Sequence, residues 1–173
     1  MKKKTLALVL ALTLLVAGVV GGTLAWLTDQ TAEVKNTFTV GDINIGLTET
    51  TTDYKMVPGN TIAKDPTVTV KANSEACWLF VKVTKSENLD TFITYAIAEG
   101  WTALPGVDGV YYREVPASAA DQTFSVLADN AVTVNSDVTK EMLTAKDFAN
   151  PTLTFKAYAV QKDNVASASD AWA

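Results

Sequence analysis

Cys77-Trp-Leu-Phe-Val-Lys-Val-Thr84 is an almost unbroken run of apolar, aromatic and β-branched residues. This composition favours a β-strand. Because apolar residues occupy successive positions, both faces of the strand are expected to be covered, as in the middle of a sheet. Trp78 and Phe80 are therefore interpreted as core residues rather than as the lining of a ligand cleft.

Alternating patterns on both sides of this run predict further strands. The clearest span residues 37–47, with a kink where glycine relaxes the pleat at Gly41-Asp42, residues 67–71 and residues 151–161. Weaker patterns lie at 92–97, 109–114 and 123–127, and turn-forming pairs such as Pro58-Gly59 and Asp108-Gly109 occur between the predicted strands. Seven or eight short strands predict an all-β fold, a jelly-roll-like sandwich of two antiparallel sheets. Helix is confined to residues 139–148, capped by Asp137 or Thr139, and to a turn at 167–172.

The N-terminus reads as an export signal. Lys2, Lys3 and Lys4 precede an apolar segment at residues 5–20, and Gly21-Gly22 ends that helix. Thr23 and Ala25 supply the small residues that a signal peptidase needs, which places the cut before Trp26. An uncleaved membrane anchor is the alternative, but the apolar run of about 16 residues is shorter than the roughly 20 that span a bilayer. We expect a signal peptide at 1–25 and a single β-sandwich domain at 26–173.

Several motifs carry a resemblance to a known family. They are the segment Gly22-Thr-Leu-Ala-Trp-Leu-Thr-Asp29, the strand Asn36-Thr-Phe-Thr-Val-Gly-Asp-Ile-Asn-Ile-Gly-Leu47, the pair Pro58-Gly59, the triplet Lys64-Asp65-Pro66, the strand that begins at Ala76, and the C-terminal Ala157-Tyr-Ala-Val-Gln161 with Asp170-Ala-Trp172. Together they resemble short Firmicutes proteins of the TasA/camelysin family. Residues 86–148 carry no matching motif.

This resemblance implies a secreted, Gram-positive protein. Its precursor would be processed at the membrane by a SipW-type signal peptidase, and the product would reach the extracellular matrix or the cell surface. Similarity to TasA, a biofilm matrix fibre protein, implies self-assembly into a homopolymer without a cofactor. Camelysin is described as a metallopeptidase, so a secreted peptidase is one alternative.

Composition argues against catalysis and against nucleic-acid binding. The chain contains no histidine, the usual ligand of zinc hydrolases and the usual base for a serine or cysteine nucleophile. Loss of the three N-terminal lysines leaves 11 basic residues against 19 acidic ones, a net charge of −8. Such a surface repels phosphate backbones. We expect neither enzymatic activity nor a metal site, and the leading hypothesis is a structural subunit. A monomeric module that binds a glycan or a host protein is the other alternative.

The segment freed by cleavage is the candidate for assembly. Residues 26–35 are polar and weakly patterned, and they join the strand predicted at 37–47. If a sheet edge or groove is open, this segment can add to a neighbouring subunit as a strand. The residues expected to take part are Trp26, Leu27, Asp29, Phe38 and Gly41. A disordered tail is the alternative for residues 26–35.

The sequence also supports predictions for Cys77, for four polar residues between 129 and 137, and for Trp101. Cys77 cannot form an internal disulfide because it is the single cysteine, and its apolar neighbours indicate a buried, inert thiol. Asp129, Asn130, Asn135 and Asp137 could bind calcium but lack the spacing of a calcium loop, so solvated turns are favoured. Trp101, with Leu104 and Pro105, is a candidate exposed apolar tip that binds a surface.

Overall fold

The computed structural model describes residues 42–51 and 54–173 of the 173-residue chain. These residues belong to one compact unit, in which antiparallel strands dominate and the helices are short. The signal peptide predicted at 1–25 and residues 37–41 of the first predicted strand lie outside the described residues.

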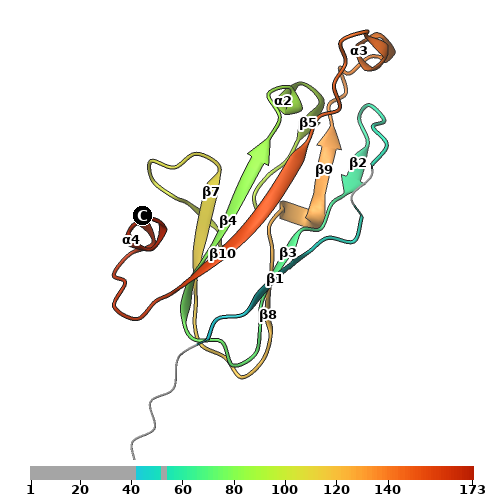
Figure 1. Ribbon diagram of the computed structural model, residues 1–173. Helices are drawn as coiled ribbons and strands as arrows, with labels where there is room; N and C mark the ends of the chain where they lie inside the picture. Colours follow the sequence, from blue (N-terminus) through green and yellow to red (C-terminus); the bar gives the residue numbers. More distant parts are fainter. Residues whose placement is uncertain (1–41, 52–53) are drawn as a thin grey trace, which may run out of the picture. The chain divides into compact units, whose positions relative to one another are not determined.

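A four-stranded antiparallel sheet contains the strand that the sequence places at its centre. β4 (Cys77–Lys85) pairs with β10 (Leu153–Gln161) on one side and with β7 (Val110–Val115) on the other. The two-residue β6 (Thr102–Ala103) extends the sheet beyond β7, so the strand order is β10-β4-β7-β6 (Figure 1). The central position of β4 is confirmed.

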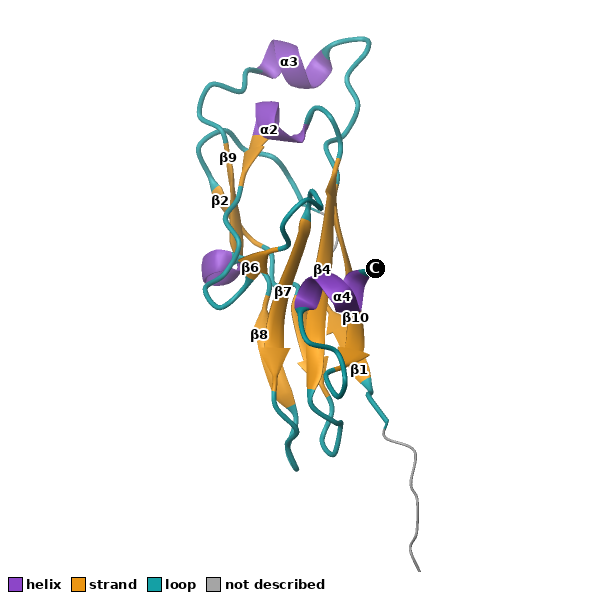
Figure 2. Ribbon diagram, turned by 90° about the vertical axis from the view of Figure 1, so that its left-hand side faces the viewer, coloured by secondary structure: helices purple, strands orange, loops and turns teal. Residues whose placement is uncertain are grey.

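Two smaller antiparallel sheets lie on one side of this four-stranded sheet. The first has the order β1-β3-β8 and consists of β1 (Ile45–Thr48), β3 (Thr67–Val70) and β8 (Gln122–Ser125). The second has the order β2-β9-β5 and consists of β2 (Thr61–Ala63), β9 (Ala131–Val134) and β5 (Ile93–Thr94). The short 3₁₀ turn η1 (Ala128–Asn130) carries the chain from β8 into β9. The described residues thus form an all-β sandwich, and Figure 2 shows β6, β7, β4 and β10 side by side.

The inner face of β4 packs against the β1-β3-β8 sheet. Cys77, Leu79 and Val81 share one buried cluster with Val68 and Val70 of β3, and all five are at most 1% exposed. This alternation is what a period of two residues requires, because successive strand side chains point to opposite faces. The buried thiol predicted for Cys77 is confirmed, and burial raises the pKa of Cys77.

The outer face of β4 is buried as well. Trp78 and Phe80 lie under the C-terminal helix α4 (Ala168–Trp172), whose N-cap Ser167 accepts a hydrogen bond from the backbone of Asp170. The ring of Trp172 lies 5.1 Å from that of Phe80, measured between centroids. The core interpretation of the two β4 aromatics is therefore confirmed.

A third cluster fills the end of the sandwich near β5 and β9. The helix α2 (Leu89–Phe92) contributes its first and last residues to this cluster, since positions i and i+3 share a helix face. This packing corrects the strand predicted at 92–97, which is reduced to the two residues of β5. The helix predicted at 139–148 is α3 (Lys140–Thr144), and Thr139 caps it by accepting the backbone N–H of Met142.

Two other predictions change. The prediction of an exposed tip at Trp101 is wrong, because Trp101 is 9% exposed and Leu104 is 3% exposed. Trp101 belongs to the inner core, and its indole N–H donates to the carbonyl of Ser125 at 2.8 Å. The strand predicted from residue 37 is not regular at 42–44. There the backbone N–H of Asn44 is bonded to the hydroxyl of Ser74, where a ladder would use a carbonyl.

Candidate binding groove

A groove of about 670 Å³ lies at one edge of the sandwich. It lies where the end of β1 and the start of β10 approach β2 and β5. Most of the lining side chains are apolar: Leu47, Met56, Ile62, Pro66, Leu89, Ile93, Val132, Pro151, Leu153 and Phe155. Its polar side chains are Thr48, Glu49, Tyr54, Lys64, Asn150, Thr152 and Thr154.

The strands that border this groove lie at the ends of their sheets. Within the described ranges, β1, β2 and β10 are each the last strand of a ladder. A last strand has a row of backbone N–H and C=O groups without a neighbouring strand. The groove therefore combines apolar side-chain sites with strands that each have one edge outside any ladder of the described residues.

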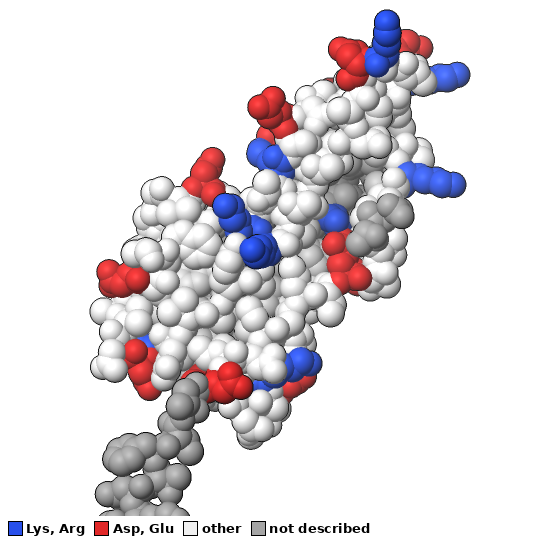
Figure 3. All heavy atoms as spheres, viewed as in Figure 1, with Lys and Arg blue, Asp and Glu red and all other residues white. Residues whose placement is uncertain are grey.

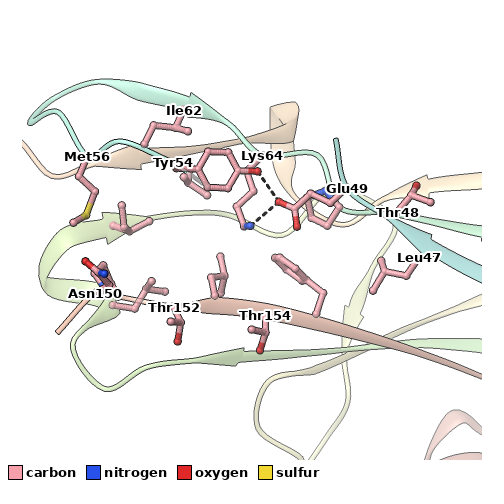
Figure 4. A pocket seen from close by; sticks show the side chains of 17 residues that line it. Leu47, Thr48, Glu49, Tyr54, Met56, Ile62, Lys64, Asn150, Thr152 and Thr154 are labelled. Carbon is pink, nitrogen blue, oxygen red and sulfur yellow. Dashed lines mark hydrogen bonds and ion pairs between the residues drawn. The ribbon is translucent and has the colours of Figure 1, made fainter. Parts of the chain in front are cut away.

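One wall of the groove carries a buried ion pair. Lys64 Nζ lies 2.6 Å from a carboxylate oxygen of Glu49, and the two side chains are only 10% and 17% exposed. The hydroxyl of Tyr54 donates to the same carboxylate at 2.8 Å. The ammonium also lies 4.9 Å from the ring centre of Tyr54 and 5.5 Å from that of Phe155. Figure 4 shows the three polar side chains meeting at this wall, opposite Thr152 and Thr154.

Electrostatics at this wall follow from burial. Removal from water raises the pKa of Tyr54 well above its ordinary value, and the neighbouring Glu49 carboxylate adds to the increase. Beside it, the backbone N–H of Thr50 donates to Asp65 at 2.9 Å, and the Thr50 hydroxyl donates to the same carboxylate. These two bonds lower the pKa of Asp65 and hold the chain after β1 against the start of β3.

The charged side chains elsewhere on this face are dispersed. Figure 3 shows the charged residues in small groups, several of them with acidic and basic residues side by side, and uncharged surface between the groups. The groove is therefore distinguished by shape and apolar lining, with the Lys64–Glu49 pair as its local charge.

The residues assigned to processing and assembly lie outside the described residues. They are Thr23, Ala25, Trp26, Leu27, Asp29, Phe38 and Gly41. The four candidate calcium ligands are described, and they occupy turns. Asp129 and Asn130 adopt left-handed φ values of 54° and 50° in η1. The Asn135 amide donates to the carbonyls of Asp90 and Thr91, which uses it for packing.

The sequence did not point to the ion pair. Lys64 and Glu49 are 15 positions apart, and no local motif joins them. The triplet Lys64-Asp65-Pro66 is one of the motifs that carry the family resemblance, and it gives no indication of a partner for Lys64. A long-range pair of this kind becomes visible when β1 and the chain before β3 are placed side by side.

No protein-family model, curated protein or solved structure matches the chain. Across residues 42–51 and 54–173, no helix is both long and apolar enough to cross a membrane. Over the same residues, no three or more cysteine or acidic side chains come together as a metal site.

Proposed function

We propose that the protein is an exported, non-catalytic structural subunit, similar to TasA, that assembles into extracellular biofilm matrix fibres or a surface layer. The observation that carries this proposal is the apolar groove bordered by three strands that end their ladders. A groove of this kind suits an extended segment better than a compact ligand, since backbone pairing and alternating apolar sites act together.

The proposed occupant is the N-terminal segment of a second copy, residues 26–41. A chain of 16 residues can reach at most about 50 Å, ample to leave its own domain and cross a neighbour's groove. Trp26, Leu27 and Phe38 supply apolar side chains for the Met56, Ile62 and Leu153 region. Because the contact joins unlike surfaces, it is head-to-tail, and each added copy presents a further groove.

The finer parts of the proposal concern topology and processing. The sandwich is proposed to be jelly-roll-like, with a signal helix in residues 1–25. A SipW-type peptidase would cut between Ala25 and Trp26, so the chain is membrane-bound only as a precursor and the product is secreted. N-terminal sequencing of protein from culture medium tests the cut directly, and any first residue other than Trp26 would contradict it.

Assembly is tested on the protein that begins at Trp26. Electron microscopy across concentration and pH should show fibres, and strictly monomeric particles under all conditions would count against assembly. Deletion of residues 26–35 should abolish the fibres.

A sharper pair of variants separates backbone pairing from mere loss of chain. Gln30→Pro with Ala32→Pro removes two N–H donors, because proline cannot pair in a ladder, and should abolish fibres. Gln30→Ala with Ala32→Ser keeps both donors and should preserve them. Equal fibre formation by the two double variants would exclude the strand-addition mechanism.

A further inference from the structure

A second unusual site lies on the edge of the sandwich away from the groove, where β6 and β7 approach β8 (Figure 2). Arg113 is the single arginine of the chain and stands on the inner face of β7, in register with Leu79 of β4. The guanidinium is therefore held between the two layers of the sandwich.

Packing fixes the position of this guanidinium. Its Cζ lies 3.9 Å from the ring centre of Phe124 and 5.4 Å from that of Trp101. Gly100 has φ +85°, and a Cβ added there would lie 3.1 Å from a terminal nitrogen of Arg113. Glycine thus lets the backbone approach the end of the side chain. A guanidinium stacked in this way keeps its N–H groups in the plane between the rings, where they stay available for hydrogen bonds.

Within the described residues, these N–H groups have no acceptor. Arg113 has no carboxylate within 4 Å, whereas Lys64, Lys71, Lys85 and Lys162 each have one. Of the buried side-chain nitrogens and oxygens in residues 42–51 and 54–173, its Nε is the one left without a partner. Exposed Glu99, next to Gly100, is not paired with it. Burial lowers the pKa of Arg113, and no neighbouring anion offsets this cost. The rings of Phe124 and Trp101 contact the guanidinium, but no described residue accepts a hydrogen bond from its N–H groups.

We propose that the terminal N–H groups of Arg113, beside Gly100, form a carboxylate-binding site, and that its ligand is an Asp or Glu side chain of a second copy of this chain. A carboxylate matches the planar fork of a guanidinium and accepts two parallel hydrogen bonds. The second copy is favoured by charge complementarity: the chain has 19 acidic residues against 14 basic ones, and only Glu49, Asp90, Glu114 and Asp121 form ion pairs in the described part. This contact needs neither the groove nor the N-terminal segment.

Because the chain has a single arginine, its side-chain Nε–H gives one unambiguous signal in a ¹H–¹⁵N spectrum. The probe is sodium acetate, titrated against sodium chloride at equal ionic strength. We expect acetate to shift this signal saturably, with a Kd on the order of 10–100 mM for one charge-assisted contact, and chloride to leave it in place. Equal shifts in both salts would overturn the site, and this titration requires no variant.

The identity of the ligand is tested by self-association in the Gln30→Pro/Ala32→Pro background, which switches off the proposed fibre contact. Sedimentation equilibrium should show weak association that falls about tenfold or more in Arg113→Lys, because lysine keeps the charge but loses the fork. Circular dichroism checks that this variant is folded. An acetate shift combined with unchanged association would overturn the second copy as the ligand. Since fibre growth is measured separately, failure here leaves the groove proposal standing.

Discussion

For the Lys64–Glu49 pair, the predicted loss of stability is larger when one partner is removed than when both are. In Lys64→Met, the Glu49 carboxylate stays 17% exposed and keeps only the Tyr54 hydroxyl. Leaving such a charge uncompensated costs about 2–4 kcal/mol of the free energy of unfolding. In Glu49→Leu, the ammonium still faces the rings of Tyr54 and Phe155, so we expect a smaller loss of about 1–3 kcal/mol.

The double variant should be more stable than either single one. Replacing both charges by apolar side chains of similar volume removes both desolvation costs, so its loss relative to the unmodified protein should be within about 1 kcal/mol. The coupling between the two positions is therefore expected to exceed about 2 kcal/mol. Urea unfolding of the protein that begins at Trp26, followed by tryptophan fluorescence, measures all four free energies.

The exposed pair Lys71–Asp121 provides the matched control. Its side chains are 50% and 48% exposed, and the Lys71→Met and Asp121→Leu changes should be additive within about 0.5 kcal/mol. A Lys64/Glu49 double variant as unstable as the sum of its single changes would refute the view that each charge is stabilised mainly by the other.

Three other predictions address the turn, the groove wall and the core. Gly109→Ala should lower the free energy of unfolding by about 2 kcal/mol or more in urea titrations, because φ is +70° and the new Cβ would lie 2.6 Å from the carbonyl of Val83; Gly46→Ala, which meets no atom within 4 Å, should be neutral or slightly stabilising. The raised pKa of Tyr54 means that its contribution is complete below about pH 10 and is lost as pH rises toward the folded-state pKa, so Tyr54→Phe should flatten the decline in stability measured above pH 10, and an unchanged slope would contradict this. Cys77, which is fully buried, should react with a thiol reagent at least about a hundredfold more slowly in native protein than in urea, and rapid native labelling would contradict its place in the core.

The strands that could be predicted are those with a strong local pattern. β3, β4, β7 and β10 follow from alternation or from a continuous apolar run, and the capping residue Thr139 from helix-cap chemistry. The strands β2, β6 and β9 were not predicted, because their two to four residues carry too little periodicity; β1, β3 and β8 are as short, but each overlaps a longer predicted pattern. β6 is a strand because the longer β7 supplies its hydrogen-bond partners. β2 and β9 are strands because they pair with each other.

The candidate sites also depend on contacts between distant segments, which a local sequence pattern does not predict. Trp101, with Leu104 and Pro105, was predicted to form an exposed apolar tip, yet it is buried against the inner core. Glu49, Tyr54 and Lys64 were not connected, since an ion pair between side chains 15 positions apart has no local signature. Arg113 likewise becomes unusual only when Trp101, Phe124 and Gly100 are seen to surround it.

By itself, the sequence determined the all-β class, the central place of β4 and the burial of its single cysteine, because hydrophobic periodicity and apolar composition act over a few residues. Only the tertiary structure decided, for the described residues, which strands end their sheets, which charges pair with little exposure to solvent, and that the Arg113 guanidinium has no acceptor. Those properties arise from segments far apart in the chain, brought together by burial of apolar surface, and local pattern does not encode which segments will meet.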